Sequence, residues 1–354
     1  MDFEQDNLGV PGQEPPRQYS QPPQQPAYIQ PPLMEKPKRR SGWKIFWAIV
    51  TVLSILANGV LLIMLLGVIA VFAAGQRELF VEEIIQPGPR TTKIAVIALD
   101  GIIDEQRAKD VAEQLKTAED DDHVKGLILR VSSPGGTISG SDDIYNEIRK
   151  YRSRTGRPVV AFMQGIAASG GYYASVACDK IIAEPTTITG SIGVIMGYFV
   201  FQELLEGKLG IQPIIVKSGR RKDWPSPFQM PTDEQRQYLQ DRLITPAYER
   251  FVQIVAEGRR SLTPEDVNRL ADGSIYSADK ALDEKLIDNI GYMDDAIKIV
   301  SEMAKIEKAQ VVEYRKPFSL AGLLSARSNA VLKIDRTTLY EMTTPQVLYL
   351  WTMY

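Results

Sequence analysis

A glycine-rich segment around one serine carries the strongest chemical signal in this sequence. Ser169 lies within residues 164–173, after an apolar run at 158–163 and before a helix-like segment at 172–177. A serine at a strand-to-helix turn, without bulky neighbours, can present its hydroxyl to a substrate. The backbone N–H groups of the helix start would face any negative charge that forms there. Ser169 is therefore a candidate nucleophile, and it needs a base.

Histidine and cysteine are too scarce to supply that base. The single histidine, His123, follows three aspartates in a polar turn and is expected to be exposed. The single cysteine, Cys178, lies among small residues and is expected in the core, so no Cys–His pair and no intrachain disulfide is predicted. No cluster of His, Cys or carboxylates has metal-ligand spacing, and we predict neither a metal nor a cofactor.

A basic loop at residues 217–223 contains the remaining candidates for a base. It holds Lys217 and Lys222 and follows an apolar run at 213–216. A lysine can deprotonate a serine when burial lowers the lysine pKa towards neutrality. The composition of the loop fits an ordinary solvated turn equally well, so the residues alone leave the base undecided.

Two more turns could complete a site around Ser169. Residues 132–137 follow an apolar run at 126–131, and their two glycines would let backbone N–H groups approach a ligand closely. Together with the Ser169 turn they would form an oxyanion hole. Residues 188–194 contain Ser191, whose hydroxyl could orient an amine. Each of these segments, taken alone, also fits an ordinary glycine-containing turn.

Short apolar runs alternate with helical patterns through the first part of the chain beyond residue 92. This alternation predicts an α/β fold with a mostly parallel sheet flanked by helices. The second half reads as more helical, with a capping-box pattern that begins at Thr232 and a Thr263–Pro264 helix start. The expected strands span residues 93–99, 126–131, 158–163 and 180–183, and the expected helices span 106–119 and 139–152.

The N-terminal region predicts a membrane anchor. Residues 1–42 are rich in proline and glutamine, and we expect them to be a disordered tail. Residues 45–75 hold no charged side chain, and at about 1.5 Å per residue such a helix exceeds a hydrocarbon core of about 30 Å. We therefore predict a transmembrane helix over 43–75. A cleaved signal peptide is disfavoured, because its apolar core is shorter and nearer the N-terminus.

The charges on either side of this helix predict its orientation. A basic cluster precedes it, and glutamates dominate the residues that follow it. The positive-inside rule then places the N-terminus in the cytoplasm and the bulk of the chain on the extracytoplasmic side of the cell membrane. We expect a linker over residues 76–92 and a C-terminal tail with an apolar tip over 315–354. The net charge of −3 gives no indication of nucleic-acid binding.

Taken together, the four turns resemble the signal peptide peptidase A (SppA) family of the ClpP/crotonase superfamily. The resemblance rests on residues 129–136, 167–173, 189–194 and 217–223 in this order, and on 273–291, which is similar to the family's closing helical segment. It covers about residues 93–305. It implies a ClpP/crotonase-like peptidase domain, which we place at 93–314. One departure is Ser132, where the family often has asparagine.

The resemblance also implies roles for individual residues. Lys217 falls on a position without a catalytic role, although it lies in the same motif as the base. The implied site comprises Ser169 as nucleophile, Lys222 as general base, Ser191 as the residue that orients the lysine, Gly136 and Gly170 as the oxyanion hole, and Ser133, Gly135 and Thr137 as substrate-binding residues. As in the short members, subunits are expected to form a homo-oligomeric ring or dome, in which the dyad can form across an interface.

The function implied by the resemblance is that of a membrane-anchored serine endopeptidase with a Ser–Lys dyad. Its expected substrates are cleaved signal peptides or other apolar peptides, and its expected partners are further copies of the chain and membrane lipid. Three alternatives stay open at this point. They are a membrane protease that clips one specific membrane protein, a crotonase-like acyl-CoA enzyme, and a non-catalytic membrane scaffold.

Overall fold

The computed structural model of the chain describes residues 42–73, 80–316 and 346–352. The chain divides into two units, residues 1–75 and 76–354, and each is described by itself. The tail predicted over residues 1–42 lies outside the described residues, except for its last residue, Gly42.

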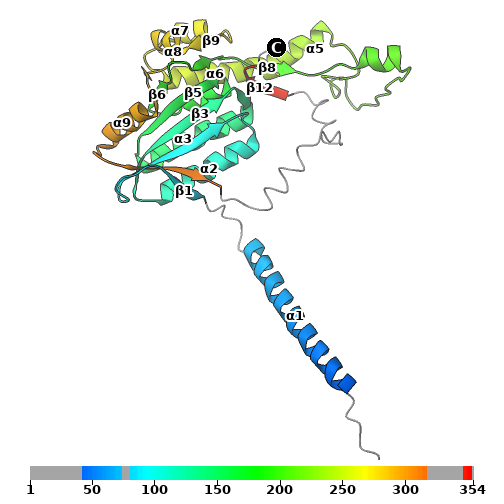
Figure 1. Ribbon diagram of the computed structural model, residues 1–354. Helices are drawn as coiled ribbons and strands as arrows, with labels where there is room; N and C mark the ends of the chain where they lie inside the picture. The colour runs from blue at the N-terminus through cyan, green and yellow to red at the C-terminus, as the bar shows by residue number, and fades with distance from the viewer. Residues whose placement is uncertain (1–41, 74–79, 317–345, 353–354) are drawn as a thin grey trace, which may run out of the picture. The chain divides into compact units, whose positions relative to one another are not determined.

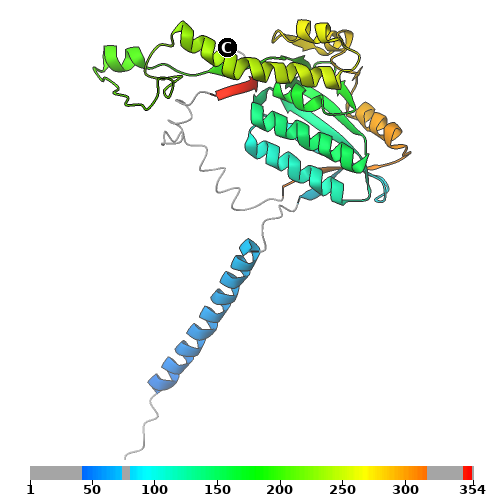
Figure 2. The ribbon, with the colours of Figure 1, turned by 180° about the vertical axis from the view of Figure 1, so that it is seen from behind.

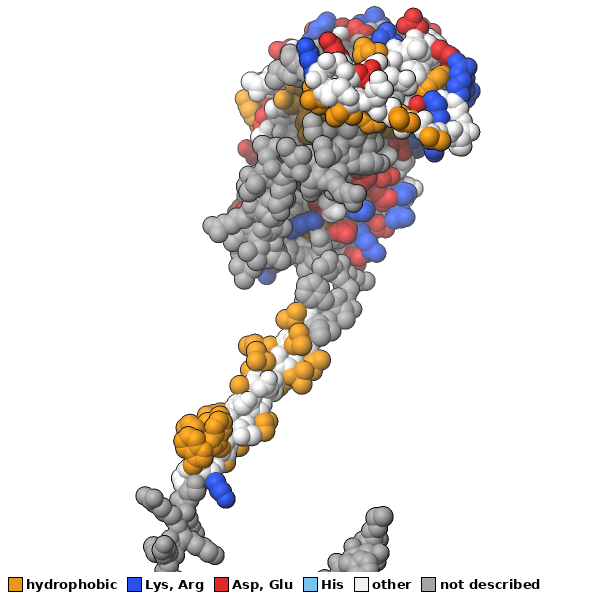
Figure 3. Space-filling model, turned by 90° about the vertical axis from the view of Figure 1, so that its right-hand side faces the viewer, with side chains coloured by type: hydrophobic (Ala, Val, Ile, Leu, Met, Phe, Trp, Pro, Cys, Tyr) orange, Lys and Arg blue, Asp and Glu red, His pale blue; other side chains and the backbone are white. Residues whose placement is uncertain are grey.

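The first unit contributes one long apolar helix, α1 (Gly42–Ala73). Its segment 42–68 has 27 residues and a mean hydropathy of 2.6, so it is long and apolar enough to cross a membrane. Figure 3 shows hydrophobic side chains along the face in view and one basic side chain near the start of the helix. That side chain is Lys44, the single charged residue of α1.

The second unit is built on a nine-stranded, mostly parallel sheet (Figure 1). Strands β2 (Lys93–Asp100), β3 (Val124–Ser133), β5 (Val159–Ala168) and β6 (Lys180–Ala183) pair in parallel and are linked in the chain by helices, which confirms the predicted α/β class. The strand order is β1 (Val81–Gln86), β11 (Gln310–Arg315), β2 (Lys93–Asp100), β3 (Val124–Ser133), β5 (Val159–Ala168), β6 (Lys180–Ala183) and β10 (Asn289–Ile290), with β7 (Ile188–Gly190) and β9 (Ile275–Ser277) joined to the end of β5.

Both faces of the sheet are buried under helices. Successive side chains of a strand point to opposite sides, so each strand contributes residues to both faces. Ala95 and Ile97 of β2 pack on the side of α2 (Glu105–Asp120) and α3 (Ile138–Thr155). Ile94 and Val96 pack on the opposite side, with α9 (Met293–Ala304). Figure 2 shows α2 and α3 side by side over one face of the sheet. The long apolar runs in the sequence follow from this two-sided burial.

The remaining helices follow the end of β5 in the chain. The predicted capping box at Thr232 is present and opens α5 (Asp233–Leu239). A π-helical turn, η2 (Gln240–Ile244), joins α5 to α6 (Thr245–Gly258), and Pro246 lies in the first turn of α6. The other elements are α4 (Gly170–Ser175), η1 (Glu203–Lys208), α7 (Pro264–Leu270) and α8 (Ala278–Asp283).

The second unit also holds a smaller, three-stranded sheet. Its middle strand, β12 (Gln346–Leu350), pairs antiparallel with both β4 (Gly135–Thr137) and β8 (Ile195–Gly197). Thus part of the predicted C-terminal tail is a strand, while residues 317–345 of that tail lie outside the described residues. Similarly, β1 lies within the predicted linker and pairs with β11.

Candidate active site

Ser169 lies at a sharp turn between β5 and α4. Its φ of 52° and ψ of −113° are unusual for a residue other than glycine, and such strain is typical of functional sites. Two hydrogen bonds hold the turn: Ser169 N–H donates to the carbonyl of Gly190 at 2.8 Å, and Tyr173 N–H donates to the carbonyl of Ser169 at 2.8 Å. The expected strand–turn–helix presentation of the serine is therefore what the chain adopts.

A glycine is needed directly after Ser169. A Cβ on Gly170 would lie 2.4 Å from the Ser141 hydroxyl oxygen, so only glycine fits there without a shift. Among the described residues, no side chain hydrogen-bonds to the Ser169 hydroxyl. The serine borders a cavity of about 420 Å³, which the turns 191–195 and 271–273, Tyr248 and residues 350–352 also line.

The glycines expected to form the oxyanion hole lie beside this turn. A Cβ built on Gly135 would lie 2.7 Å from the backbone nitrogen of Gly170, which shows how closely β4 approaches the start of α4. Gly136 packs as tightly on the other side, since its Cβ would lie 1.9 Å from the carbonyl oxygen of Ile103. The structure thus brings residues 135–136, Ser169 and Gly170 together. Their role as oxyanion donors stays a prediction.

The hydroxyls expected to bind substrate have structural partners instead. The Ser133 side chain is buried and accepts the N–H of Gly135 at 3.1 Å, which shapes the turn. Thr137 caps α3 by accepting the N–H of Gly140 at 3.1 Å. The backbone of β4, by contrast, is paired with an extended segment of the chain, β12. Any contribution of Gly135 and Thr137 to binding would therefore come from the backbone of this strand.

Ser191 lies next to Ser169 in the same cavity. It has a φ of 49° and donates its N–H to the carbonyl of Ser274 at 2.7 Å. The preceding Gly190 has a φ of 84°, and a Cβ there would lie 2.5 Å from the ring of Tyr276. The 188–194 turn therefore lies beside Ser169, and the role of Ser191 in orienting the lysine stays a prediction.

Lys222 does not reach Ser169 within one chain. It lies in an exposed loop, it does not line the cavity at Ser169, and its side chain has no hydrogen bond or ion pair within residues 80–316 and 346–352. Lys217, in the same loop, forms an ion pair with Asp223 at 2.6 Å. The assignment of Lys222 as the base therefore stays a prediction, and a single copy of the chain leaves the nucleophile without it.

Among the described residues that line the cavity, Asp272 is the one carboxylate, and it is a poor base. Hydrogen bonds from the hydroxyl and the N–H of Ser274 lower the pKa of Asp272. A carboxylate stabilised in its charged form has little tendency to take a proton from a serine. The described lining of the cavity in one chain thus contains the candidate nucleophile, Ser169, and no adequate base.

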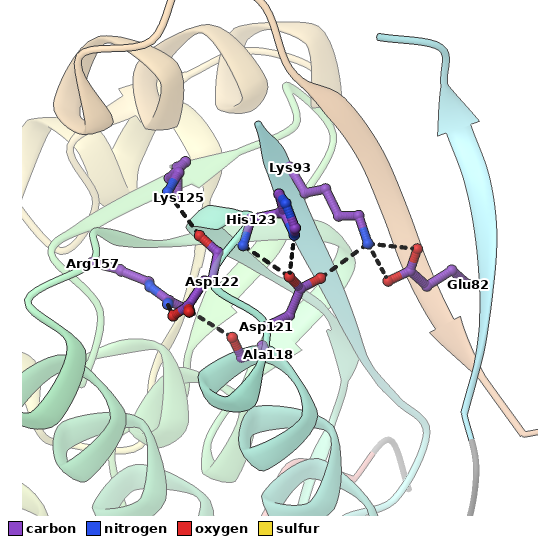
Figure 4. Close-up of polar contacts among 8 residues, drawn as sticks. All are labelled: Glu82, Lys93, Ala118, Asp121, Asp122, His123, Lys125 and Arg157. Atoms are coloured by element: carbon purple, nitrogen blue, oxygen red, sulfur yellow. Dashed lines mark hydrogen bonds and ion pairs between the residues drawn. The ribbon is translucent and has the colours of Figure 1, made fainter. Parts of the chain in front are cut away.

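His123 lies at the opposite end of the parallel strands from Ser169. It precedes β3, whereas Ser169 follows the parallel strand β5, so the two residues lie at opposite ends of neighbouring strands. Its ring nitrogen lies 3.1 Å from Asp121, which also pairs with Lys93 at 2.9 Å (Figure 4). The prediction of an exposed loop histidine is confirmed, since 56% of its side chain is exposed.

The single cysteine and groups of possible metal ligands are the other candidates for a role at the site. Cys178 is buried, and burial raises the pKa of its thiol, which makes it unreactive. Within the described part of the chain, no group of three or more His, Cys, Asp or Glu side chains is placed to hold a metal ion.

Sequence reasoning missed the part that the C-terminal segment plays at this site. Residues 350–352 line the Ser169 cavity, and β12 fills the space between β4 and β8. The continuous apolar run from Val347 to Trp351 was the available signal for a buried strand. That pattern alone could not indicate which strands it would join.

Comparisons with known proteins identify the family and support the fold. The family model described as Peptidase family S49 matches residues 151–307, and the model described as Clp protease matches residues 82–187. The Clp protease match spans β1 to β6 and supports a ClpP-like α/β fold. A solved structure of a ClpP1 mutant from Listeria monocytogenes aligns with a TM-score of 0.39 at 18% identity, over 57% of this chain and 94% of that chain, a likeness too low to support an argument.

Sequence relatives give a more specific result. A protein of Enterococcus faecium named for signal peptide peptidase SppA is 37% identical over 245 residues, which are 66% of this chain and 70% of that protein. Protease 4 of Salmonella typhi is 35% identical over 62% of this chain and 35% of its own length. The chloroplastic serine protease SPPA of Arabidopsis thaliana is 32% identical over 65% of this chain and 34% of its own length. The chain therefore belongs to the SppA family of serine-type peptidases, peptidase family S49.

Proposed function

We propose that this chain is a membrane-anchored serine endopeptidase that uses Ser169 as nucleophile and Lys222 as general base to hydrolyse remnant signal peptides and similar apolar peptides. The observation that carries the proposal is the strained Ser169 turn, which lies beside close-packed glycine backbone and beside a strand, β4, that is paired with an extended segment. A protease needs this combination, because an extended peptide must pass the nucleophile with its carbonyl near N–H donors.

The chemistry follows in ordinary steps. Neutral Lys222 takes the proton of the Ser169 hydroxyl while the serine oxygen attacks a peptide carbonyl. The backbone N–H groups of Gly136 and Gly170 stabilise the negative charge on the carbonyl oxygen. The ammonium of Lys222 then protonates the leaving amine, the C–N bond breaks, and water hydrolyses the acyl-enzyme with the same lysine as base.

The dyad forms between neighbouring copies of the chain. Lys222 is exposed in one copy, yet a lysine base must be buried for its pKa to fall. The segment from β8 to α6 projects from the sheet (Figure 1) and exposes large apolar side chains near Lys222. Ile214 and Val216 are 89% and 94% exposed. A second copy that covers this segment would bury Lys222 and place it near the Ser169 and Ser191 hydroxyls of a partner, in a homo-oligomer such as a ring or dome.

A membrane anchor would keep the peptidase unit close to substrates that lie in the bilayer. Helix α1 is long enough to span the bilayer, and the basic cluster before it favours a cytoplasmic N-terminus and an extracytoplasmic peptidase unit. Signal peptides are apolar segments that remain in the bilayer after their release. The names of the relatives, signal peptide peptidase SppA among them, support this substrate class.

Two variants test the assignment in the full-length protein. Ser169→Ala and Lys222→Ala should each reduce hydrolysis of an apolar fluorogenic peptide by at least about a thousand-fold, because each removes one member of a unit that acts together. Lys116→Ala, which changes an exposed lysine on α2, is the matched control and should keep wild-type turnover. Wild-type turnover in Lys222→Ala would overturn the base assignment. A fluorophosphonate adduct that persists in Ser169→Ala would overturn the assignment of Ser169 as the nucleophile.

A further inference from the structure

The loop of residues 217–223, which carries Lys222, is closed by contacts of its own. Lys217, at the start of the loop, forms an ion pair with Asp223, at its end, at 2.6 Å. The Asp223 side chain is only 12% exposed, so water screens this pair less than it screens a surface pair. The N–H of Lys222 donates to the carbonyl of Gly219 at 3.1 Å, so the chain turns just before the lysine. The ion pair therefore joins the two ends of the loop.

Two further contacts fasten this loop to helix α5. The Arg221 guanidinium lies over the ring of Tyr238, a residue of α5, with its carbon 4.7 Å from the ring centroid. The same carbon lies 5.6 Å from the ring centroid of Trp224, and the two rings meet edge to face at 5.6 Å. Arg220 forms an ion pair with Glu234, also on α5. Because the face of an aromatic ring attracts a cation, two rings hold Arg221 at once.

These contacts single out Lys222 within the loop. In the described part of the chain, every other charged side chain of residues 217–223 has a partner, and Lys222 has none. Its neighbours in the chain are both held, Arg221 by the rings and Asp223 by Lys217. The N–H of Trp224 also donates to the carbonyl of Arg221 at 3.2 Å. A backbone that is fixed on both sides limits the space that the Lys222 amine can reach, and a reaction between two copies needs such positioning.

We propose that Arg221 is a positioning residue for the general base. Its guanidinium and the rings of Trp224 and Tyr238 form a clamp that fixes the loop to α5 and presents Lys222 to the serine of a neighbouring copy. The proposal rests on the proposed function for the role of Lys222. It adds a cation and two rings that touch no substrate and that set how often the base is in place.

Turnover of the full-length protein tests the positioning. Arg221→Ala should lower kcat on an apolar peptide by about tenfold and leave KM unchanged, because the base is less often in place while the peptide-binding strands are intact. Arg221→Lys keeps a cation at the rings and should recover part of the loss, whereas the neutral Arg221→Gln should recover none. Arg236→Ala, which removes an exposed arginine of α5, is the matched control and should keep the wild-type kcat.

Two kinetic outcomes would overturn the positioning role. One is a wild-type kcat in Arg221→Ala when Lys222→Ala is inactive, which would leave the proposed function standing. The other is an effect of Arg221→Ala on KM alone, which would place Arg221 in substrate binding.

A double-mutant cycle tests whether the cation and the ring act as one unit. Tyr238→Leu removes a ring and should lower kcat by no more than Arg221→Ala does. The double variant should match Arg221→Ala, because the ring has no further role once the cation is gone. Tyr238→Phe keeps the ring and should retain the wild-type kcat. Losses that multiply in the double variant would show two independent effects and would overturn the clamp.

Hydrogen exchange tests the clamp without any need for catalysis. In the full-length Ser169→Ala chain, adding Arg221→Ala should speed amide exchange in residues 217–224 by about tenfold, because the loop opens more often. Adding Arg236→Ala instead should leave this exchange unchanged. Equal exchange with and without Arg221→Ala would overturn the clamp. Faster exchange in Arg221→Ala, combined with wild-type turnover in Lys222→Ala, would support the clamp and overturn the proposed function.

Discussion

At the scale of single residues, Ser169 is held in a conformation that most serines avoid. A φ of 52° at a residue other than glycine costs about 1–3 kcal/mol, and the hydrogen bonds to Gly190 and from Tyr173 offset that cost. This arrangement places the hydroxyl at the end of β5 and the N–H groups of α4 behind it. The strain is therefore an expected feature of a nucleophile, as in other strand–turn–helix sites.

A second residue-scale feature, the pair of Asp288 and Arg259, holds the last parallel strand in place. Asp288 accepts hydrogen bonds from Arg259 at 2.8 Å and from the N–H of Ile181 at 2.8 Å. Burial alone would raise the pKa of Asp288, but these bonds and the charge of Arg259 lower it overall. A lowered carboxyl pKa stabilises the fold above the unfolded-state pKa, and that stability is lost as the pH falls through the folded-state pKa.

We predict that Asp288→Asn lowers the free energy of unfolding by about 2–3 kcal/mol at pH 7, because Arg259 is left buried without its partner. The deficit should shrink as the pH falls below about 4, because the unfolded wild-type chain then binds a proton at Asp288 and the folded carboxylate follows at a lower pH. Thermal unfolding of the detergent-solubilised protein between pH 7 and pH 3 measures this. Asp143→Asn, at an exposed carboxylate on α3, is the control. A deficit that stays constant down to pH 3 would contradict the account.

At the scale of elements, the short strand β4 matters more than its three residues suggest. Its first residue, Gly135, has a φ of 100° and leaves no room for a Cβ beside the Tyr349 carbonyl. Gly156, which ends α3 with a φ of 65°, has open space around it. Both glycines have a positive φ that favours glycine, and only Gly135 also lies beside the Ser169 turn.

Substitutions at Gly156 and Gly135 therefore separate the effect of backbone strain on stability from an effect on activity. Gly156→Ala should lower the free energy of unfolding by about 1 kcal/mol and leave peptide hydrolysis unchanged. Gly135→Ala should in addition reduce hydrolysis by about a hundred-fold or more, because the new methyl group displaces the substrate carbonyl from its N–H donors. Steady-state kinetics on both variants measure this. Equal activities of the two variants would show that Gly135 does not border the reacting carbonyl.

The sequence predicts the long elements of this molecule well and the short ones poorly. Strands such as β3 and β5 are buried on both faces, and they therefore appear as continuous apolar runs. The strands β4, β8 and β12 are short, and β12 pairs with β4 across about 200 residues of sequence, so no local pattern could predict the pairing. Lys222 illustrates the same limit, since its assignment as the base depends on assembly rather than on its own segment.

At the scale of the whole molecule, the chain needs an anchor and a defined orientation to reach its proposed substrates. Cys178 is buried with a raised pKa, so single cysteines placed elsewhere can be labelled selectively. We predict that Thr91→Cys, at an exposed position, reacts with a membrane-impermeant maleimide on intact cells. Ser20→Cys, in the N-terminal tail, should react only after the cells are permeabilised. The reverse pattern would contradict the orientation, and recovery of the protein without membranes would contradict the anchor.

The most direct test of the central claim combines two inactive proteins. Full-length Ser169→Ala and Lys222→Ala chains are co-expressed, purified as mixed oligomers and assayed on an apolar peptide. If each site takes its serine from one copy and its lysine from the next, random mixing should restore about a quarter of wild-type activity. The same two variants, purified separately and combined without exchange of subunits, should stay inactive. Mixed oligomers with no more activity than either variant alone would contradict a Ser169–Lys222 dyad shared between neighbouring copies.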